Sequence, residues 1–171
     1  DEVWRYVATA WKLTLSDDQK SLPEFLREGL GRFEGRRGAE ELLYQRALLS
    51  SGQEALDDLG RALDLRPKYP LALLLRGVLR SRQNDLEGAI SDYDRCIQLW
   101  PRFSQVHVNR GLALAGLKRW NEAVSAYTEA IQMNPDFAMA YNNRGNAHGA
   151  LRNFSSAVAD SSPAGRTRMT R

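Results

Sequence analysis

Apolar positions along most of the chain recur at intervals of three and four residues, and short polar breaks separate the runs. In residues 119–132, for example, Trp120, Ala123 and Tyr127 would all fall on one face of a helix. The preceding run, residues 103–116, has a similar apolar face, and only the letters LKR separate the two runs. So short a connection leaves room for little more than a tight turn between antiparallel helices. The pattern therefore predicts paired helices and no strand.

The helix pair returns with a period of 34 residues. Proline, glycine and alanine recur in register at this interval, and an arginine precedes each of the glycines. Agreement of this kind at one period indicates a repeat protein in which each unit is one helical hairpin. The recurring positions are Pro67, Pro101, Pro135, Gly77, Gly111, Gly145, Ala89, Ala123, Ala157, Arg76, Arg110 and Arg144.

Each recurring residue type has a physical reason to recur. Gly111 and Ala123 fall where the two helices of a hairpin cross, and a larger side chain at either position would push the helix axes apart. Pro135 ends the second helix, because the residue before a proline is driven out of the helical conformation. Arg110 is expected at the seam with the preceding hairpin, where its stem packs and its guanidinium meets a carboxylate or a helix-end carbonyl.

A 34-residue hairpin with glycine at one helix crossing, alanine at the other, an aromatic residue four positions later and a closing proline resembles the tetratricopeptide repeat. The resemblance implies an all-α fold, a right-handed α-α superhelix of helix hairpins. Residues 70–103 and 104–137 match the repeat throughout. Residues 36–69 form a divergent unit with Leu43 in place of the glycine, and residues 138–160 form a truncated one.

The two ends of the chain do not follow the repeat. Residues 161–171 read as a basic tail, and Ser161 stands where two earlier units have a tyrosine. The last repeat would leave uncovered the face on which a further hairpin would stack. Either the natural chain continues beyond this point, or a partner covers that face, with the tail reaching an acidic surface or RNA. Residues 1–35 are expected to form an N-terminal helical pair. Its first helix would bury a face made of Trp4, Val7, Ala8, Trp11 and Leu15.

The resemblance also implies where a partner would bind. In tetratricopeptide arrays the free faces of the first helices line a concave groove that holds a peptide or helix of another protein. The first helix of the unit at 70–103, PLALLLRGVL, is apolar nearly all round, so either the N-terminal pair or a partner would cover it. By register with the family, the groove residues are Leu71, Leu74, Leu75, Val78, Arg82, Gln105, Val108, Asn109, Leu112, Gly116, Met139, Asn142, Asn143, Asn146 and Ala150.

One specialised role within the family is not expected here. Co-chaperone members hold the C-terminal carboxylate of a chaperone with a clamp of lysine, asparagine and arginine side chains. Counted from residue 70, the corresponding positions hold Leu74, Val78, Asn109, Met139 and Asn143, of which only Asn109 agrees. Starting the register one unit earlier gives no better agreement.

Charge and reactive side chains change this picture little. The chain has 171 residues and a net charge of +3, and the excess lies in residues 138–171, which hold five arginines and one aspartate. Because charge is mixed elsewhere, nucleic acid is not expected as a partner except through the basic tail. Cys96 is the only cysteine, and His107 and His148 are the only histidines. They predict no disulfide, no metal site and no catalytic pair.

The glycine- and arginine-rich stretch GLGRFEGRRG at 29–38 is interpreted as a linker, because a phosphate-binding loop would follow a strand. The sequence thus predicts a non-catalytic scaffold without cofactor or small-molecule substrate, which binds a peptide or helix of another protein. A permanent subunit of a large multiprotein or ribonucleoprotein complex is the alternative, and both remain open at this point.

No apolar run is long enough to span a membrane, and no signal-peptide pattern opens the chain. A soluble protein, intracellular or organellar, is therefore expected, although the compartment is not specified. The chain starts at Asp1 rather than at a methionine, which indicates a processed protein or part of a longer one.

Overall fold

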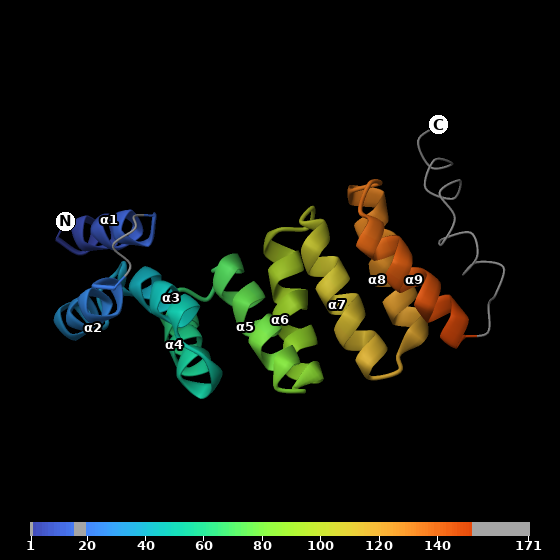
Figure 1. Ribbon diagram of the computed structural model, residues 1–171, viewed down its shortest axis with the longest axis horizontal. Coiled ribbons are helices and arrows are strands. Elements are labelled where there is room, and N and C mark those ends of the chain that lie inside the picture. The colour runs from blue at the N-terminus through green and yellow to red at the C-terminus, as the bar shows by residue number, and fades with distance from the viewer. Residues whose placement is uncertain (1, 16–19, 152–171) are drawn as a thin grey trace. The chain divides into compact units, whose positions relative to one another are not determined.

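The computed structural model describes residues 2–15 and 20–151, and every regular element within these ranges is a helix (Figure 1). The chain divides into two compact units, residues 1–76 and 77–171, and the division falls inside the fifth helix. The helices are α1 (Glu2–Leu15), α2 (Leu22–Phe33), α3 (Ala39–Leu49), α4 (Gly52–Leu65), α5 (Pro70–Arg82), α6 (Leu86–Leu99), α7 (Ser104–Gly116), α8 (Trp120–Met133) and α9 (Ala138–Ala150).

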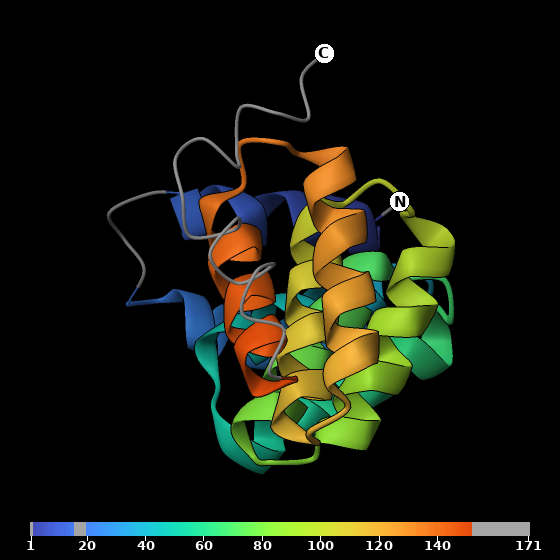
Figure 2. The ribbon, with the colours of Figure 1, turned by 90° about the vertical axis from the view of Figure 1, so that its right-hand side faces the viewer.

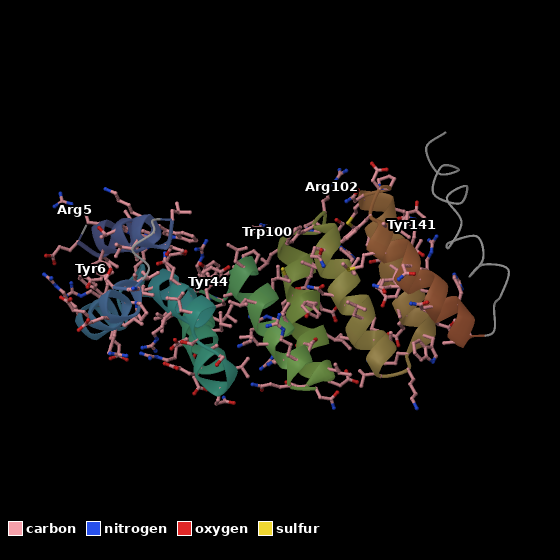
Figure 3. All side chains as sticks on the ribbon, viewed as in Figure 1. Arg5, Tyr6, Tyr44, Trp100, Arg102 and Tyr141 are labelled. Atoms are coloured by element: carbon pink, nitrogen blue, oxygen red, sulfur yellow. The ribbon has the colours of Figure 1, made fainter. Side chains whose placement is uncertain are left out.

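An apolar core joins α1 to α4 in the first unit. Val7, Leu26 and Phe33 contribute to it and are at most 4% exposed. Tyr6 closes the contact between α1 and α2 (Figure 3). Its ring stacks on Phe25 with 4.0 Å between centroids, and its hydroxyl donates to the Phe25 carbonyl oxygen over 3.0 Å.

The buried face of α1 differs from the predicted one. The prediction placed both tryptophans inside, but the helix is turned by one residue, about 100°. Val3, Val7 and Ala10 form a slim ridge that packs against the neighbouring helices, because bulky indoles would hold α1 away from α2 and α3. The predicted residues that are instead exposed are Trp4 (44%), Trp11 (36%), Leu15 (84%) and Ala8.

Helices α7 and α8 form an antiparallel hairpin close to the predicted bounds of 103–116 and 119–132. Ala89 and Ala123 are fully buried, as positions at helix crossings require. Helices α4, α6 and α8 each end two residues before a proline, which confirms the predicted stops at Pro67, Pro101 and Pro135. The expected continuation after residue 151, with Ala157, Ser161 and the tail at 161–171, lies outside the described residues.

Glycine and tyrosine fit together across each regular hairpin. A methyl group added to Gly111 would meet the Tyr127 ring at 2.5 Å, and one added to Gly77 would meet the Tyr93 ring at 2.6 Å. Both tyrosines are 1% exposed, and burial raises the pKa of Tyr127 to about 12. The ring therefore occupies the space where the glycine has no side chain, which gives the recurring glycine a definite partner.

The first unit fills the corresponding positions in another way. Leu43 stands where the later hairpins have glycine, and Leu59 stands where they have tyrosine. Both leucines are buried, at 2% and 0% exposure. Two leucines thus take the place of a glycine and a tyrosine. The combined side-chain volume stays similar, which explains how this divergent hairpin keeps its packing although its sequence departs from the pattern.

Buried ion pairs join the two helices of two hairpins at equivalent repeat positions. Arg46 of α3 donates to Asp58 of α4 over 2.6 Å, and Arg80 of α5 donates to Asp92 of α6 over 2.8 Å. Each aspartate side chain is at most 2% exposed. The sequence pattern does not reveal these pairs, because each arginine lies twelve residues from its aspartate, on the other helix of the hairpin.

Replacing Gly111 with alanine is expected to destabilise the protein by about 1–3 kcal/mol, because the new methyl group would displace the buried Tyr127 ring. Gly60, inside α4, is the matched control, since nothing lies within 4 Å of the corresponding position. Gly60→Ala should be neutral or should stabilise by up to about 1 kcal/mol. Chemical denaturation measures both, and equal effects of the two substitutions would contradict the packing argument.

Candidate partner-binding face

Helices α7 and α9 pack against each other on one side of the second unit, with α6 and α8 on the other side (Figure 2). Both are the first helices of their hairpins. Their exposed faces follow the spacing of a single helical stripe, from Gln105 through Asn109 and Leu112 in α7, and from Met139 through Asn143 and Asn146 in α9. Each residue of one stripe has its repeat equivalent on the other, so the two helices present matched rows.

The exposure of the predicted groove residues varies widely. Leu112 and Met139 are large apolar side chains that are 45% and 50% exposed. The residues that are half-buried are Leu71, Leu74, Leu75, Val78, Gln105, Asn109 and Asn143, and those that are exposed are Arg82, Gly116, Asn142, Asn146 and Ala150.

Val108 does not belong to an accessible surface. It is 0% exposed and therefore cannot contact a partner in this conformation. Its repeat equivalent in α9, Asn142, is exposed, so the same register position is covered in one hairpin and open in the next. The prediction for Val108 was wrong because register with the family does not show how far neighbouring residues cover each position.

The matched rows of α7 and α9 carry no charged side chain. In α7 the Gln105 amide nitrogen donates to the Asn109 amide oxygen over 2.9 Å, which leaves the Asn109 amide nitrogen pointing away from this bond. Asparagine side chains supply both donors and acceptors, and Leu112 and Met139 add exposed apolar area. The face can therefore bind by hydrogen bonds and apolar contact rather than by ion pairs.

Of the recurring arginines, Arg110 makes the predicted seam contact with a carboxylate, and Arg144 contacts a hydroxyl at the equivalent seam. Arg110 of α7 donates to Asp94 of α6 over 2.5 Å. Arg144 of α9 donates to Thr128 of α8 over 3.1 Å, and it is only 7% exposed. Both contacts link a first helix to the second helix of the preceding hairpin. Arg76, in the first unit, is half-buried.

The two histidines and the cysteine differ in burial and in contacts. His107 is 3% exposed, and its two ring nitrogens lie 2.9 Å from a Glu129 carboxylate oxygen and 3.1 Å from the Pro101 carbonyl oxygen. His148 is half-buried. Cys96 is fully buried, and burial raises the pKa of its thiol to about 11. Over the described ranges no cluster of three or more metal-ligating side chains occurs.

Family models match two segments of the chain. A tetratricopeptide-repeat model matches residues 49–102, and a second model of the repeat matches residues 116–151. Together they cover more than half of the chain, including the glycine–tyrosine hairpin formed by α5 and α6. The chain is a tetratricopeptide-repeat protein. Proteins of this family are typically non-catalytic, and in general terms this one is a scaffold for protein–protein interaction.

Solved structures with the same fold are numerous, although their sequence identity to this tetratricopeptide chain is low. A crystal structure of MamA has a TM-score of 0.84 at 18% identity, covering 93% of this chain and 87% of its own. MamA from Desulfovibrio magneticus RS-1 has a TM-score of 0.85 at 16% identity and covers 100% of this chain and 97% of its own. YrrB has a TM-score of 0.83 at 17% identity, with coverages of 96% and 84%.

These likenesses establish the fold, an all-α helical-repeat superhelix. Among proteins with curated descriptions, none matches the sequence of this chain. Within the parts of the chain that the structure describes, no helix is both long enough and apolar enough to cross a membrane.

The Cys96 thiol should resist disulfide reagents in the folded tetratricopeptide chain. Thiolate is the reactive form, and the folded state holds the thiol protonated up to a pKa of about 11. At about pH 8, the rate at which Cys96 is labelled should therefore be limited by transient unfolding of the second unit. A Cys96→Ala protein carrying Ser91→Cys, whose position in α6 is exposed, is the control and should react rapidly.

The same shift has a consequence for stability. The unfolded chain releases the thiol proton at a lower pH than the folded chain does, so the contribution of Cys96 is fully present below about pH 9 and is lost as pH rises towards 11. Fast labelling of native Cys96, at the rate of the Ser91→Cys control, would contradict its burial.

Proposed function

We propose that the matched rows of α7 and α9 form a binding face for an uncharged, extended or helical segment of another protein. The single observation that carries this proposal is the pairing of exposed apolar side chains, Leu112 and Met139, with an uncharged set of amide side chains. Amides can satisfy the backbone groups of a bound segment, while the two apolar side chains bury area against it.

The wider repeat fold supports this assignment. YrrB, one of the structural relatives, is described as a tetratricopeptide protein with an unusual peptide-binding site, so peptide recognition is compatible with the fold. We infer that the present chain acts by recognition and not by catalysis. The predicted groove residues of α5, among them Leu74 and Val78, are not part of the face formed by α7 and α9. Whether the N-terminal helical pair or a partner covers them stays a prediction.

The experiment is a selection of peptides from a random library on the immobilised full chain, followed by measurement of Kd for the selected peptides. Leu112→Glu should weaken binding by about tenfold or more, corresponding to ~1.4 kcal/mol, because a carboxylate would lose its water against an uncharged ligand. Gln132→Glu, at an exposed position of α8, introduces the same charge on the opposite layer and should leave Kd unchanged.

Asn109→Ala is the second arm of the test. Loss of its amide should weaken the binding of the selected peptides by roughly 1 kcal/mol, the net contribution of one hydrogen bond. If Leu112→Glu and Gln132→Glu weaken binding equally, or if neither does, the peptides bind elsewhere and the face of α7 and α9 is not the site.

A permanent subunit would behave differently. Such a chain buries its faces in a large interface, often well above 2,000 Å², and it would aggregate or form oligomers when isolated. A chain that stays monomeric in light scattering while it binds the selected peptides supports the scaffold proposal over the permanent-subunit alternative.

A further inference from the structure

The first unit contains a pocket that lies apart from the α7–α9 face. It has a volume of about 550 Å³ and is bounded by Trp4 of α1, the α2–α3 loop at 35–37, Glu40 of α3 and the end of α4 at Leu65 and Arg66. The sequence predicted a linker over 29–38, but residues 29–33 form the end of α2. The rest of the stretch meets α1 and α4 only when the unit folds, so the sequence could not indicate a pocket there.

Gly38 brings this loop against α1. Its φ is +103°, a left-handed conformation that favours glycine. A methyl group added there would also meet the Val3 side chain at 2.7 Å. Any other residue would force the loop away from α1, and Arg36 and Arg37 would move with it.

The arginines of the pocket differ from their neighbours in the same unit. Arg32, Arg46 and Arg61 each form an ion pair, with Glu2, Asp58 and Glu34 respectively. The pocket arginines, Arg36, Arg37 and Arg66, have no carboxylate partner among the described residues.

Arg36, Arg37 and Arg66 are exposed. The Arg36 guanidinium lies 6.0 Å from the centre of the Phe33 ring, and that of Arg66 lies 4.7 Å from the centre of the Tyr69 ring. Stacking on a ring face restrains a guanidinium but leaves its N–H donors free at the edge. The pocket thus presents guanidinium donors, two of them restrained by a ring, for which the described part of the chain shows no acceptor.

Among the described residues that line this pocket, Glu40 alone carries a carboxylate. It is 6% exposed, and one of its oxygens accepts a hydrogen bond from the Gly38 backbone nitrogen over 2.7 Å. Glu40 therefore fixes the loop through its hydrogen bond with the Gly38 backbone and does not neutralise the three exposed arginines. The accessible lining of the pocket is positively charged.

An apolar pocket adjoins the charged one and shares Gly35 and Leu65 with it. Its volume is about 230 Å³, and Leu30, Ala39 and Leu43 form its floor, with the Arg61–Glu34 ion pair at its edge. This second pocket has room for one side chain of a ligand. Because the two pockets share a wall, they can take neighbouring residues of one segment.

We propose that these adjoining pockets bind an acidic peptide segment in which an apolar side chain lies next to an aspartate or glutamate. The apolar side chain enters the pocket lined by Leu30 and Leu43, and the carboxylate accepts hydrogen bonds from Arg37 and Arg66. Hydrogen bonds between charged groups are stronger than those between neutral groups. This site is independent of the α7–α9 face and gives the scaffold a second recognition surface.

RNA matches the surroundings less well. Residues 1–76 carry one more acidic than basic side chain, whereas a nucleic-acid surface is basic over a wide area. The positive charge is local, as recognition of a single carboxylate requires.

The test uses short acetylated and amidated peptides with a Phe-Glu core, titrated into the full chain by calorimetry or fluorescence anisotropy. The Phe-Glu peptide should bind about tenfold more tightly than its Phe-Gln and Ala-Glu counterparts, and added salt should weaken it. An Arg37→Gln and Arg66→Gln double variant should abolish the preference for glutamate over glutamine.

The control variant is Lys12→Gln with Arg27→Gln, which removes the same charge from exposed positions of α1 and α2 outside both pockets. It should keep the preference, and so should Leu112→Glu, which separates this site from the proposed function. Thermal unfolding should show that all variants fold.

Four outcomes would overturn the proposal. They are the absence of Phe-Glu binding, equal affinity for Phe-Glu and Phe-Gln, an equal loss in the Lys12/Arg27 control, and tighter binding of single-stranded RNA or of a phosphoserine peptide than of the Phe-Glu peptide.

Discussion

The packing of a tyrosine ring onto a glycine sets the distance between the two helices of each regular hairpin. Tyr127 occupies the space at Gly111, and Tyr93 that at Gly77, with less room than a single methyl group would need. The close approach of the helices places Ala89 and Ala123 in full burial. Repeat arrays are stabilised mainly within units and between neighbours, so this local fit positions the helix faces that we propose for binding.

The faces that remain free follow from that packing. Once α8 and the seam contacts of Arg110 and Arg144 hold the first helices, one stripe of α7 and of α9 is left to solvent. It carries amides and two apolar side chains rather than charges. In the first unit, by contrast, the pocket beside α1 gathers Arg36, Arg37 and Arg66, for which no carboxylate partner occurs among the described residues. The same scaffold thus offers two surfaces with different chemistry.

The sequence predicted what depends on spacing along the chain. The glycine, alanine and proline registers, the hairpin bounds and the seam role of Arg110 all follow from a period that is visible in one sequence. It could not predict which face of α1 packs inward, which leaves Trp4 exposed, nor that neighbouring residues cover Val108 completely. The pocket formed by Arg37 and Arg66 was also beyond reach, because residues distant in sequence meet there only through the packing of α1 to α4.

The divergent hairpin shows how to test the central packing claim, since Leu43 and Leu59 fill there the positions of glycine and tyrosine. The decisive measurement is a double-mutant cycle on unfolding free energy with Gly111→Leu, Tyr127→Leu and the two combined. The double variant should be more stable than the sum of the single effects by about 1–3 kcal/mol, because two leucines fill the space that the tyrosine ring leaves. Strictly additive effects would show that Gly111 and Tyr127 do not depend on each other, and would contradict their packing as a pair.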